Sequence, residues 1–200
     1  MCRTYPGWVP TTTTPWRQQW NLPNAITATR IATVPFFVWA LLADGGESQT
    51  WRWVATVIFA VSASTDKLDG YLARRRNLVT DLGKLLDPIA DKALVGTALV
   101  GLSIIGELWW WVTALILVRE LGITVMRFFM LRYVVLPASR GGKVKTVLQS
   151  AAIVALLAPT WVLPGFVHVV GVVLMVAAVV VTVVTGVDYL VQAARLRPKR

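Results

Sequence analysis

The sequence predicts an all-α integral membrane protein with six transmembrane helices. Hydrophobic residues make up 56% of the 200 positions and the mean hydropathy is +0.63. Both values exceed what a soluble domain of this size needs for its core. The apolar residues form six long runs, each about long enough to cross ~30 Å of hydrocarbon, and charged or Gly- and Pro-containing stretches separate them.

The chain is expected to form one domain over residues 21–194. Residues 1–20 are rich in Thr and Pro, and Trp16 and Trp20 suit the headgroup layer, so this segment is predicted to be mobile and interfacial. Residues 195–200 form a basic tail. The predicted helices cover, approximately, residues 24–43, 51–73, 81–106, 109–133, 144–162 and 166–194.

The distribution of charge predicts the orientation of the helices. Positive residues concentrate in the connections 74–84 and 132–145 and in the tail, which the positive-inside rule places in the cytoplasm of a multi-pass cell-membrane protein. Both termini are then cytoplasmic. The acidic residues Asp44, Glu47 and Glu107 fall outside. Tryptophans are expected as an aromatic belt at the outer boundary, at positions Trp51, Trp53, Trp109, Trp110, Trp111 and Trp161.

Other features of the composition exclude several classes of function. The net charge is +10, but the basic residues flank apolar runs and form no continuous basic face, so nucleic-acid binding is not expected. Cys2 is the only cysteine, which excludes an internal disulfide. His168 is the only histidine, and a structural role is expected for it because a lone histidine is a poor metal site.

Four aspartates in apolar surroundings are the candidate catalytic centre. Asp66 and Asp69 are i,i+3 on one predicted helix, and Asp87 and Asp91 are i,i+4 on the next, so each pair projects from one helix face. Carboxylates within a membrane are costly unless they are paired, solvated or metal-bound. Two divalent cations would balance four negative charges, and oxygen ligands favour Mg²⁺, Mn²⁺ or Ca²⁺ over Zn²⁺. Pairing with nearby cations is the open alternative, through Lys67, Arg74, Lys84 and Lys92.

A second cluster is cationic and predicts a phosphate site. Arg119 and Arg127 are i,i+8 on the fourth predicted helix, and Lys143 and Lys145 lie in a loop at the start of the fifth. A helix N-terminus beside lysines favours an anion, and guanidinium groups bind phosphate in a bidentate manner. The open alternative is that the two arginines pair with Glu120 and that the lysines are ordinary positive-inside residues.

The aspartate region resembles the signature of the CDP-alcohol phosphatidyltransferases, D-x-x-D-G-x-x-A-R-(x)8-G-x-x-x-D-x-x-x-D. All eight fixed positions match, namely Asp66, Asp69, Gly70, Ala73, Arg74, Gly83, Asp87 and Asp91. The cationic region, Arg-Glu with a later Arg and then Gly-Lys-x-Lys-Thr-x-x-Gln, is similar to family members that use a glycerol phosphate acceptor. The resemblance extends from about Asn21 to Leu190.

The resemblance implies transfer of the phosphatidyl group from CDP-diacylglycerol to sn-glycerol 3-phosphate, giving phosphatidylglycerophosphate and CMP. It further implies a homodimer and two Mg²⁺ or Mn²⁺ ions held by the four aspartates, with Asp91 also the general base. The residues implied to bind CDP-diacylglycerol are Asn24, Thr27, Gly70, Ala73, Arg74, Thr80 and Gly83. Those implied to bind the acceptor phosphate are Arg119, Arg127, Lys143 and Lys145.

Two other functions stay open at this point. A related enzyme with another acceptor, such as inositol phosphate or phosphatidylglycerol, would keep the aspartates and change only the cationic pocket. A divalent-cation transporter would also use intramembrane acids. It would have no need for Arg74, Gly83 or the phosphate-directed cations.

Overall fold

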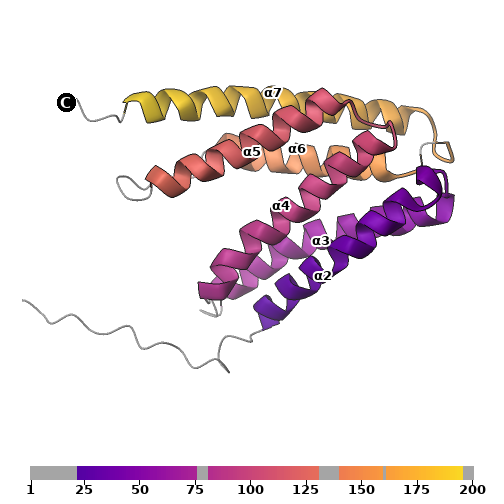
Figure 1. Ribbon diagram of the computed structural model, residues 1–200, viewed down its shortest axis with the longest axis horizontal. Helices are drawn as coiled ribbons and strands as arrows, with labels where there is room; N and C mark the ends of the chain where they lie inside the picture. The colour runs from indigo at the N-terminus through magenta and orange to yellow at the C-terminus, as the bar shows by residue number, and fades with distance from the viewer. Residues whose placement is uncertain (1–21, 76–80, 131–139, 160, 196–200) are drawn as a thin grey trace, which may run out of the picture.

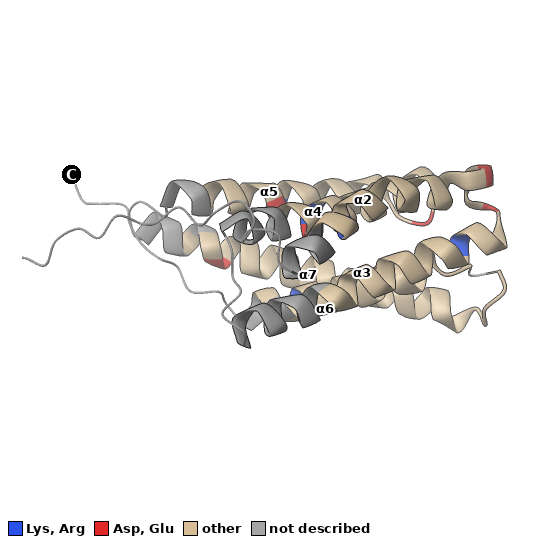
Figure 2. Ribbon diagram, turned by 90° about the horizontal axis from the view of Figure 1, so that it is seen from below, with Lys and Arg blue, Asp and Glu red and all other residues tan. Residues whose placement is uncertain are grey.

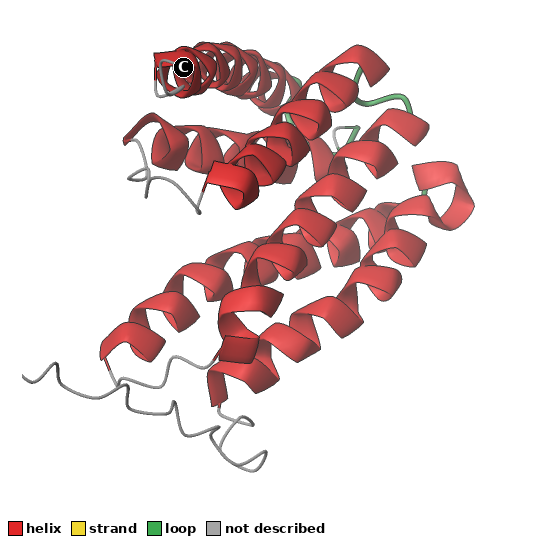
Figure 3. Cartoon of the chain, turned by 60° about the vertical axis from the view of Figure 1, so that its left-hand side comes forward, coloured by secondary structure: helices red, strands yellow, loops and turns green. Residues whose placement is uncertain are grey.

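The computed structural model describes residues 22–75, 81–130, 140–159 and 161–195. Over these ranges the chain is helical, without strands, as predicted (Figure 3). The interfacial segment predicted at residues 1–20 and most of the basic tail lie outside the described residues. The elements are α2 (Leu22–Leu42), η1 (Ala43–Gly46), α3 (Gln49–Arg75), α4 (Asp81–Ile104), α5 (Trp110–Met130), α6 (Arg140–Leu157) and α7 (Phe166–Arg195).

The helices form two neighbouring groups, α2 to α4 and α5 to α7, which α4 joins (Figure 1). α4 contacts α2, α3, α5 and α6, while α7 packs on α6 and α5. The described connections 43–48, 105–109, 158–159 and 161–165 lie toward one end of the molecule (Figure 1). The end of α3 and the start of α4 lie together at the other end. Successive helices therefore alternate in direction.

Most helix boundaries agree with the prediction to within a few residues, but the fifth predicted helix is wrong at both ends. The sequence predicts residues 144–162, whereas α6 covers Arg140–Leu157. The helix stops before Pro159, which lacks a backbone donor and disfavours helical geometry in the residue before it. At its start the helix includes Gly141 and Gly142 despite their low helix propensity. Lys143 and Lys145 therefore lie on the helix and not in a preceding loop.

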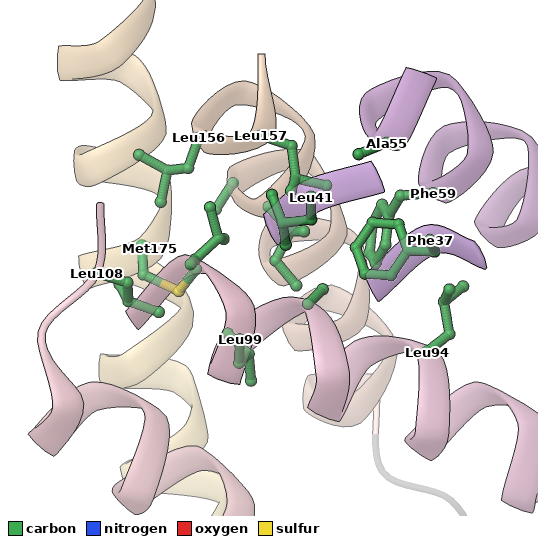
Figure 4. Close-up of a cluster of buried hydrophobic side chains, with 14 of the residues drawn as sticks. Phe37, Leu41, Ala55, Phe59, Leu94, Leu99, Leu108, Leu156, Leu157 and Met175 are labelled. Carbon is green, nitrogen blue, oxygen red and sulfur yellow. The ribbon is translucent and has the colours of Figure 1, made fainter. Parts of the chain in front are cut away.

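The core lies where the two helix groups meet (Figure 4). Phe37 and Phe59 from α2 and α3 lie with ring centroids 6.1 Å apart. Large side chains of α4 and α6, including Leu94, Leu99 and Leu156, are buried in the same cluster. Small residues bring the helix backbones close: a Cβ at Gly171 of α7 would lie 3.1 Å from the Cβ of Ala155 in α6. The core thus fixes α4 between the two groups.

A turn with left-handed backbone geometry separates α2 from α3. Asp44, Gly45 and Gly46 have φ values of 51°, 67° and 86°. Gly46 is also buried, and a Cβ there would lie 2.8 Å from Cγ2 of Ile105. Only glycine combines this geometry with this packing without strain. The polar stretch predicted to end the first helix therefore forms a tight reversal at the far end of the molecule.

The outer surface of α7 is apolar. Within the described residues, one helix, Phe166–Tyr189, is long and apolar enough to cross a membrane, with a mean hydropathy of 2.8 over its most apolar window. Its valines are largely exposed, including Val173, Val180 and Val184. Val144–Leu157 is a shorter apolar helix. Six membrane crossings remain a prediction, which the six described α-helices allow.

A buried arginine joins three segments at the end opposite the aspartates. Arg52 of α3 is 2% exposed. Its Nε donates a hydrogen bond to the carbonyl of Leu157 and its Nη2 donates one to the carbonyl of Leu156, both at 2.9 Å. Its Nη2 also lies 3.0 Å from Oε1 of Glu107. The ring of Trp161 lies 5.3 Å from the guanidinium carbon. Arg52 therefore caps α6 at its C-terminus, where the last carbonyls of a helix lack intrahelical partners.

Candidate active site

A cavity of about 90 Å³ lies between α4, α5 and α6. The direction of α5 is opposite to that of α4 and α6, so the charged residues of the three helices fall at one end of the cavity (Figure 1). The buried side chains of Leu99 and Ile116 line the other end. The polar lining residues are Asp91, Lys92, Glu120, Lys145, Thr146, Gln149 and Ser150.

Helical spacing explains why these side chains meet. On α6, Lys145 and Gln149 are i,i+4, and both are only 4% exposed. On α4, Asp91 and Val95 follow the same spacing. Figure 2 shows that the described helices carry few Lys, Arg, Asp or Glu residues along most of their length, with some such positions near the α4 and α5 labels. Buried polar groups in an apolar bundle require partners, and Lys145 has such a partner at the cavity in Glu120.

Glu120 is at the centre of the ion pairs around this cavity. Its Oε1 contacts Nζ of Lys145 from α6 and lies 3.2 Å from Nη1 of Arg119. Lys145 also interacts electrostatically with Asp91 across the cavity. Lys92, the residue after Asp91 on α4, donates a hydrogen bond to Thr124 of α5. The cavity is therefore lined by acidic and basic side chains in defined places.

Arg119 points away from the cavity, toward α7. Its Nη2 donates to Oγ1 of Thr185 at 2.7 Å, and its Cγ lies 3.5 Å from where a Cβ of Gly186 would be. Arg119 does not line the cavity that contains Asp91 and Lys145. The open alternative, in which Arg119 pairs with Glu120, is therefore what the structure contains. The predicted convergence of all four cations is not seen for this residue.

The other two predicted cations, Arg127 and Lys143, lie within α5 and α6, and their side chains are outside the described part of the structure. Of the four predicted phosphate-binding residues, the structure thus places Lys145 on the cavity wall and Arg119 outside the cavity, paired with Glu120. The sequence interpretation assigned no binding role to five polar residues of the cavity, Lys92, Glu120, Thr146, Gln149 and Ser150. Each of them is a polar residue in an apolar helix, and this is the signal by which they could have been found.

Asp91 is the predicted metal ligand whose side chain the structure describes. It is half-buried and lines the cavity. Asp66 and Asp69 lie in α3 and Asp87 lies in α4, but their side chains are outside the described residues. Among the described side chains, no group of three His, Cys, Asp or Glu residues could hold a metal. The convergence of the four acids remains a prediction.

The backbone and the donor chemistry fit a divalent-metal centre. Both aspartate pairs lie in continuous helix, so each pair keeps the i,i+3 or i,i+4 spacing that puts two carboxylates on one face. The ends of α3 and α4 that carry them lie at the same end of the molecule (Figure 1). Carboxylate oxygens are the ligands that Mg²⁺ and Mn²⁺ prefer.

Most of the residues predicted to bind CDP-diacylglycerol lie on helices α2, α3 and α4. Asn24 and Thr27 lie in α2, while Gly70, Ala73 and Arg74 lie in α3 and Gly83 lies in α4. Their side chains, and Thr80 altogether, are outside the described residues. The next turns of α2 and α3 enclose a cavity of about 400 Å³, lined by Thr29, Arg30, Thr33, Val57, Ile58, Val61, Ser62 and Thr65. The sequence interpretation assigned no binding role to these residues.

A family profile and two similar proteins all indicate the same family. The family profile described as CDP-alcohol phosphatidyltransferase matches residues 20–184. A probable phosphatidylglycerophosphate synthase of Mycobacterium tuberculosis is 50% identical over 175 residues, which cover 88% of this chain and 82% of the relative. The CDP-diacylglycerol–glycerol-3-phosphate 3-phosphatidyltransferase of Bacillus subtilis is 40% identical over 147 residues, covering 68% of this chain and 76% of the relative.

Proposed function

The chain belongs to the CDP-alcohol phosphatidyltransferase family, and on that premise we propose that it transfers the phosphatidyl group from CDP-diacylglycerol to sn-glycerol 3-phosphate. The products are phosphatidylglycerophosphate and CMP. The observation that carries this choice of acceptor is the cavity that Asp91, Lys92 and Lys145 line together. A carboxylate and an ammonium group in one small cavity suit a substrate that has both a reacting hydroxyl and a phosphate. The names of the relatives support the same acceptor.

The acceptor phosphate is held at the charged end of the cavity. Lys145 has three N–H donors, so it can keep its contact with Glu120 while it donates to a phosphate oxygen. Lys92 adds a second positive charge on the opposite wall. Arg127, seven residues after Glu120 on α5, and Lys143, two residues before Lys145 on α6, belong to the same proposed phosphate site. Arg119 contributes indirectly, by holding Glu120 in place.

Asp91 acts as the general base. The primary hydroxyl of glycerol phosphate loses its proton to the Asp91 carboxylate as its oxygen attacks the phosphorus that bears the diacylglycerol. A bond forms between that oxygen and the phosphorus. The bond from the same phosphorus to the oxygen that bridges the two phosphates breaks, and CMP leaves with the electron pair. The half-buried position of Asp91 at the charged end of the cavity supports this role.

Two Mg²⁺ or Mn²⁺ ions, held by Asp66, Asp69, Asp87 and Asp91, would neutralise the diphosphate and polarise the attacked phosphorus. Around them, Gly70, Ala73 and Gly83 leave room for the nucleotide, and Asn24, Thr27, Arg74 and Thr80 hold its polar groups. The groove between α2 and α3 accommodates the glycerol backbone and the start of the acyl chains. Its lining supports this because Arg30 and the hydroxyls of Thr29, Thr33, Ser62 and Thr65 accompany apolar side chains.

The protein is proposed to be a multi-pass protein of the cell membrane with six crossings. Both termini and the aspartates face the cytoplasm, where nucleotides and glycerol phosphate are available. The alternating helix directions and the tryptophans at the start of α5 support this topology. The exposed valines of α7 provide an apolar face for lipid or for the second copy of a homodimer. Residues 1–20 lie at the membrane surface and 195–200 in the cytoplasm.

An acceptor panel tests the proposed function. Purified protein is incubated with CDP-diacylglycerol and Mg²⁺, and with one of glycerol 3-phosphate, inositol phosphate or phosphatidylglycerol, and the lipid product is identified by mass. We expect phosphatidylglycerophosphate with the first acceptor and at most traces of product with the others. Preferred use of inositol phosphate or phosphatidylglycerol would make the protein a related transferase. Absence of CMP release with every acceptor would favour a transporter and overturn the proposal.

A further inference from the structure

We propose that Glu120 determines which acceptor the cavity admits, by accepting a hydrogen bond from the secondary hydroxyl of the polyol phosphate. This inference rests on the proposed function, because it concerns the acceptor of that reaction. It assigns to Glu120 a contact with substrate in addition to its ion pairs. The substrate class that follows is a phosphorylated polyol with a hydroxyl at the carbon next to the reacting one.

The first argument is the hydrogen-bonding capacity that Glu120 retains. Both of its cationic contacts, to Lys145 and to Arg119, are made through Oε1. Among the contacts within the described part of the chain, none involves Oε2, and 28% of the side chain is exposed. An ionised carboxylate offers about four acceptor positions on its two oxygens. Glu120 can therefore accept a hydrogen bond from a hydroxyl without losing its contact with either cation.

The second argument is that the polar groups of the substrate match different side chains of the cavity. Glycerol phosphate presents three kinds of polar group: a phosphate, the attacking primary hydroxyl and the secondary hydroxyl. Lys92 and Lys145 suit the phosphate, and Asp91 suits the attacking hydroxyl. Glu120 is the other carboxylate on the cavity wall, and it comes from a different helix than Asp91. The secondary hydroxyl is the donor on the substrate that remains for it.

The third argument is that Glu120 is held rigidly, as a specificity-determining group must be. Lys145 holds it from α6, and Arg119, which is itself anchored by Thr185 of α7, holds it from its own helix. A polar site that is fixed to accept a hydroxyl discriminates against a substrate that lacks it, because the site is left without its partner. A deoxy acceptor should therefore be used poorly.

The test compares glycerol 3-phosphate with 3-hydroxypropyl phosphate, which lacks only the secondary hydroxyl. The measured quantity is kcat/KM for each acceptor and the ratio between them. We expect wild type to prefer glycerol phosphate by roughly 10- to 150-fold, the range for one hydrogen bond to a charged group. In Glu120→Ala the ratio should fall to within about threefold of unity, and Glu120→Gln, whose amide oxygen still accepts, should give an intermediate ratio.

Lys92→Met is the matched control, because Lys92 lines the cavity but its hydrogen bond is to Thr124 and not to Glu120. Both acceptors carry the phosphate that Lys92 is proposed to bind, so this variant should lower kcat/KM for both by similar factors and leave the ratio near the wild-type value. Thermal unfolding and CDP-diacylglycerol KM confirm that each variant is folded. If Glu120→Ala does not fold, the wild-type ratio and Glu120→Gln decide the question.

The outcomes separate this inference from the proposed function. A wild-type protein that uses both acceptors equally, or a Glu120→Ala variant that keeps the wild-type ratio, would overturn the role of Glu120 and leave the transferase proposal intact. A wild-type protein that transfers to neither acceptor would overturn the proposed function itself, and the inference with it. A ratio that falls equally in Lys92→Met would also contradict the inference, because the discrimination would then not belong to Glu120.

Discussion

Replacing Arg52 with Met should destabilise the protein without changing its substrate binding. The substitution keeps much of the aliphatic volume and removes three close contacts, to the carbonyls of Leu156 and Leu157 at 2.9 Å and to Glu107 at 3.0 Å. Glu107, whose side chain is only 16% exposed, would lose its arginine partner. Arg52 lies 14 residues before Asp66 on the same helix, which is about 21 Å, so the aspartate region should be unaffected.

The expected loss in the free energy of unfolding follows from these contacts. A hydrogen bond to a charged group contributes roughly 1.5–3 kcal/mol, but the three contacts share one guanidinium and are not additive. Removing one partner of a buried ion pair costs about 3–5 kcal/mol, and we take this as the expected loss. For a chain of this length each kcal/mol corresponds to about 2–4 °C. The melting temperature of Arg52→Met should therefore fall by about 6–20 °C.

Thermal unfolding of the purified protein in detergent, followed by tryptophan fluorescence, measures this loss. Glu47→Gln is the matched control, since Glu47 is exposed near the same end and should change stability by no more than about 0.5 kcal/mol. The double variant Arg52→Met with Glu107→Gln should be more stable than the sum of the single losses predicts, by about 0.5–3 kcal/mol. A change in Arg52→Met no larger than that of the control, or strict additivity, would refute the reasoning.

Three further predictions concern the aspartates and the helix packing. Asp91→Asn keeps the shape of the side chain and removes its basicity, so kcat should fall by at least about 100-fold, and turnover within tenfold of wild type would exclude Asp91 as the base. Chelation should abolish CMP release and Mg²⁺ or Mn²⁺ should restore it, whereas full activity after verified metal removal would contradict the two-metal centre. Gly171→Val should lower the free energy of unfolding by about 1–3 kcal/mol, because a Cβ there would lie 3.0 Å from Cδ2 of Leu156. Gly122→Val is the control, since a Cβ at Gly122 would meet no atom within 4 Å. An equal loss in both variants would exclude crowding as the cause.

The sequence predicted the helices well because their signal is local. Long apolar runs and the polar stretch at Asp44 determine where α2, α3 and α4 begin and end, and Pro159 could have corrected the end of α6. The sequence pattern also indicated that Asp91 and Lys145 lie near each other, and both line one cavity. Their roles in binding metal and phosphate remain predictions.

The direction of Arg119 could not be predicted, because it depends on which helix lies opposite. Adjacent residues on a helix point about 100° apart, since 3.6 residues complete a turn. Glu120 therefore faces α6 and the cavity, while Arg119 faces Thr185 on α7, a residue 66 positions away in sequence. The partners of Arg52 are also distant in sequence: Glu107 is 55 positions away, and Leu156 and Leu157 are 104 and 105 positions away. Contacts of this kind arise from tertiary packing and leave no mark in local spacing.

The most direct test of the account is the KM for glycerol 3-phosphate in Lys145→Met, measured as CMP release at saturating CDP-diacylglycerol and Mg²⁺. Loss of one hydrogen bond from a charged donor, worth roughly 1.5–3 kcal/mol, should raise this KM by about 10- to 150-fold. The KM for CDP-diacylglycerol should stay within about twofold of wild type, because Lys145 lies in the cavity between α4, α5 and α6 and not in the groove between α2 and α3. A raised KM for CDP-diacylglycerol with an unchanged KM for glycerol 3-phosphate would contradict the account, since it would assign the cavity to the nucleotide-lipid.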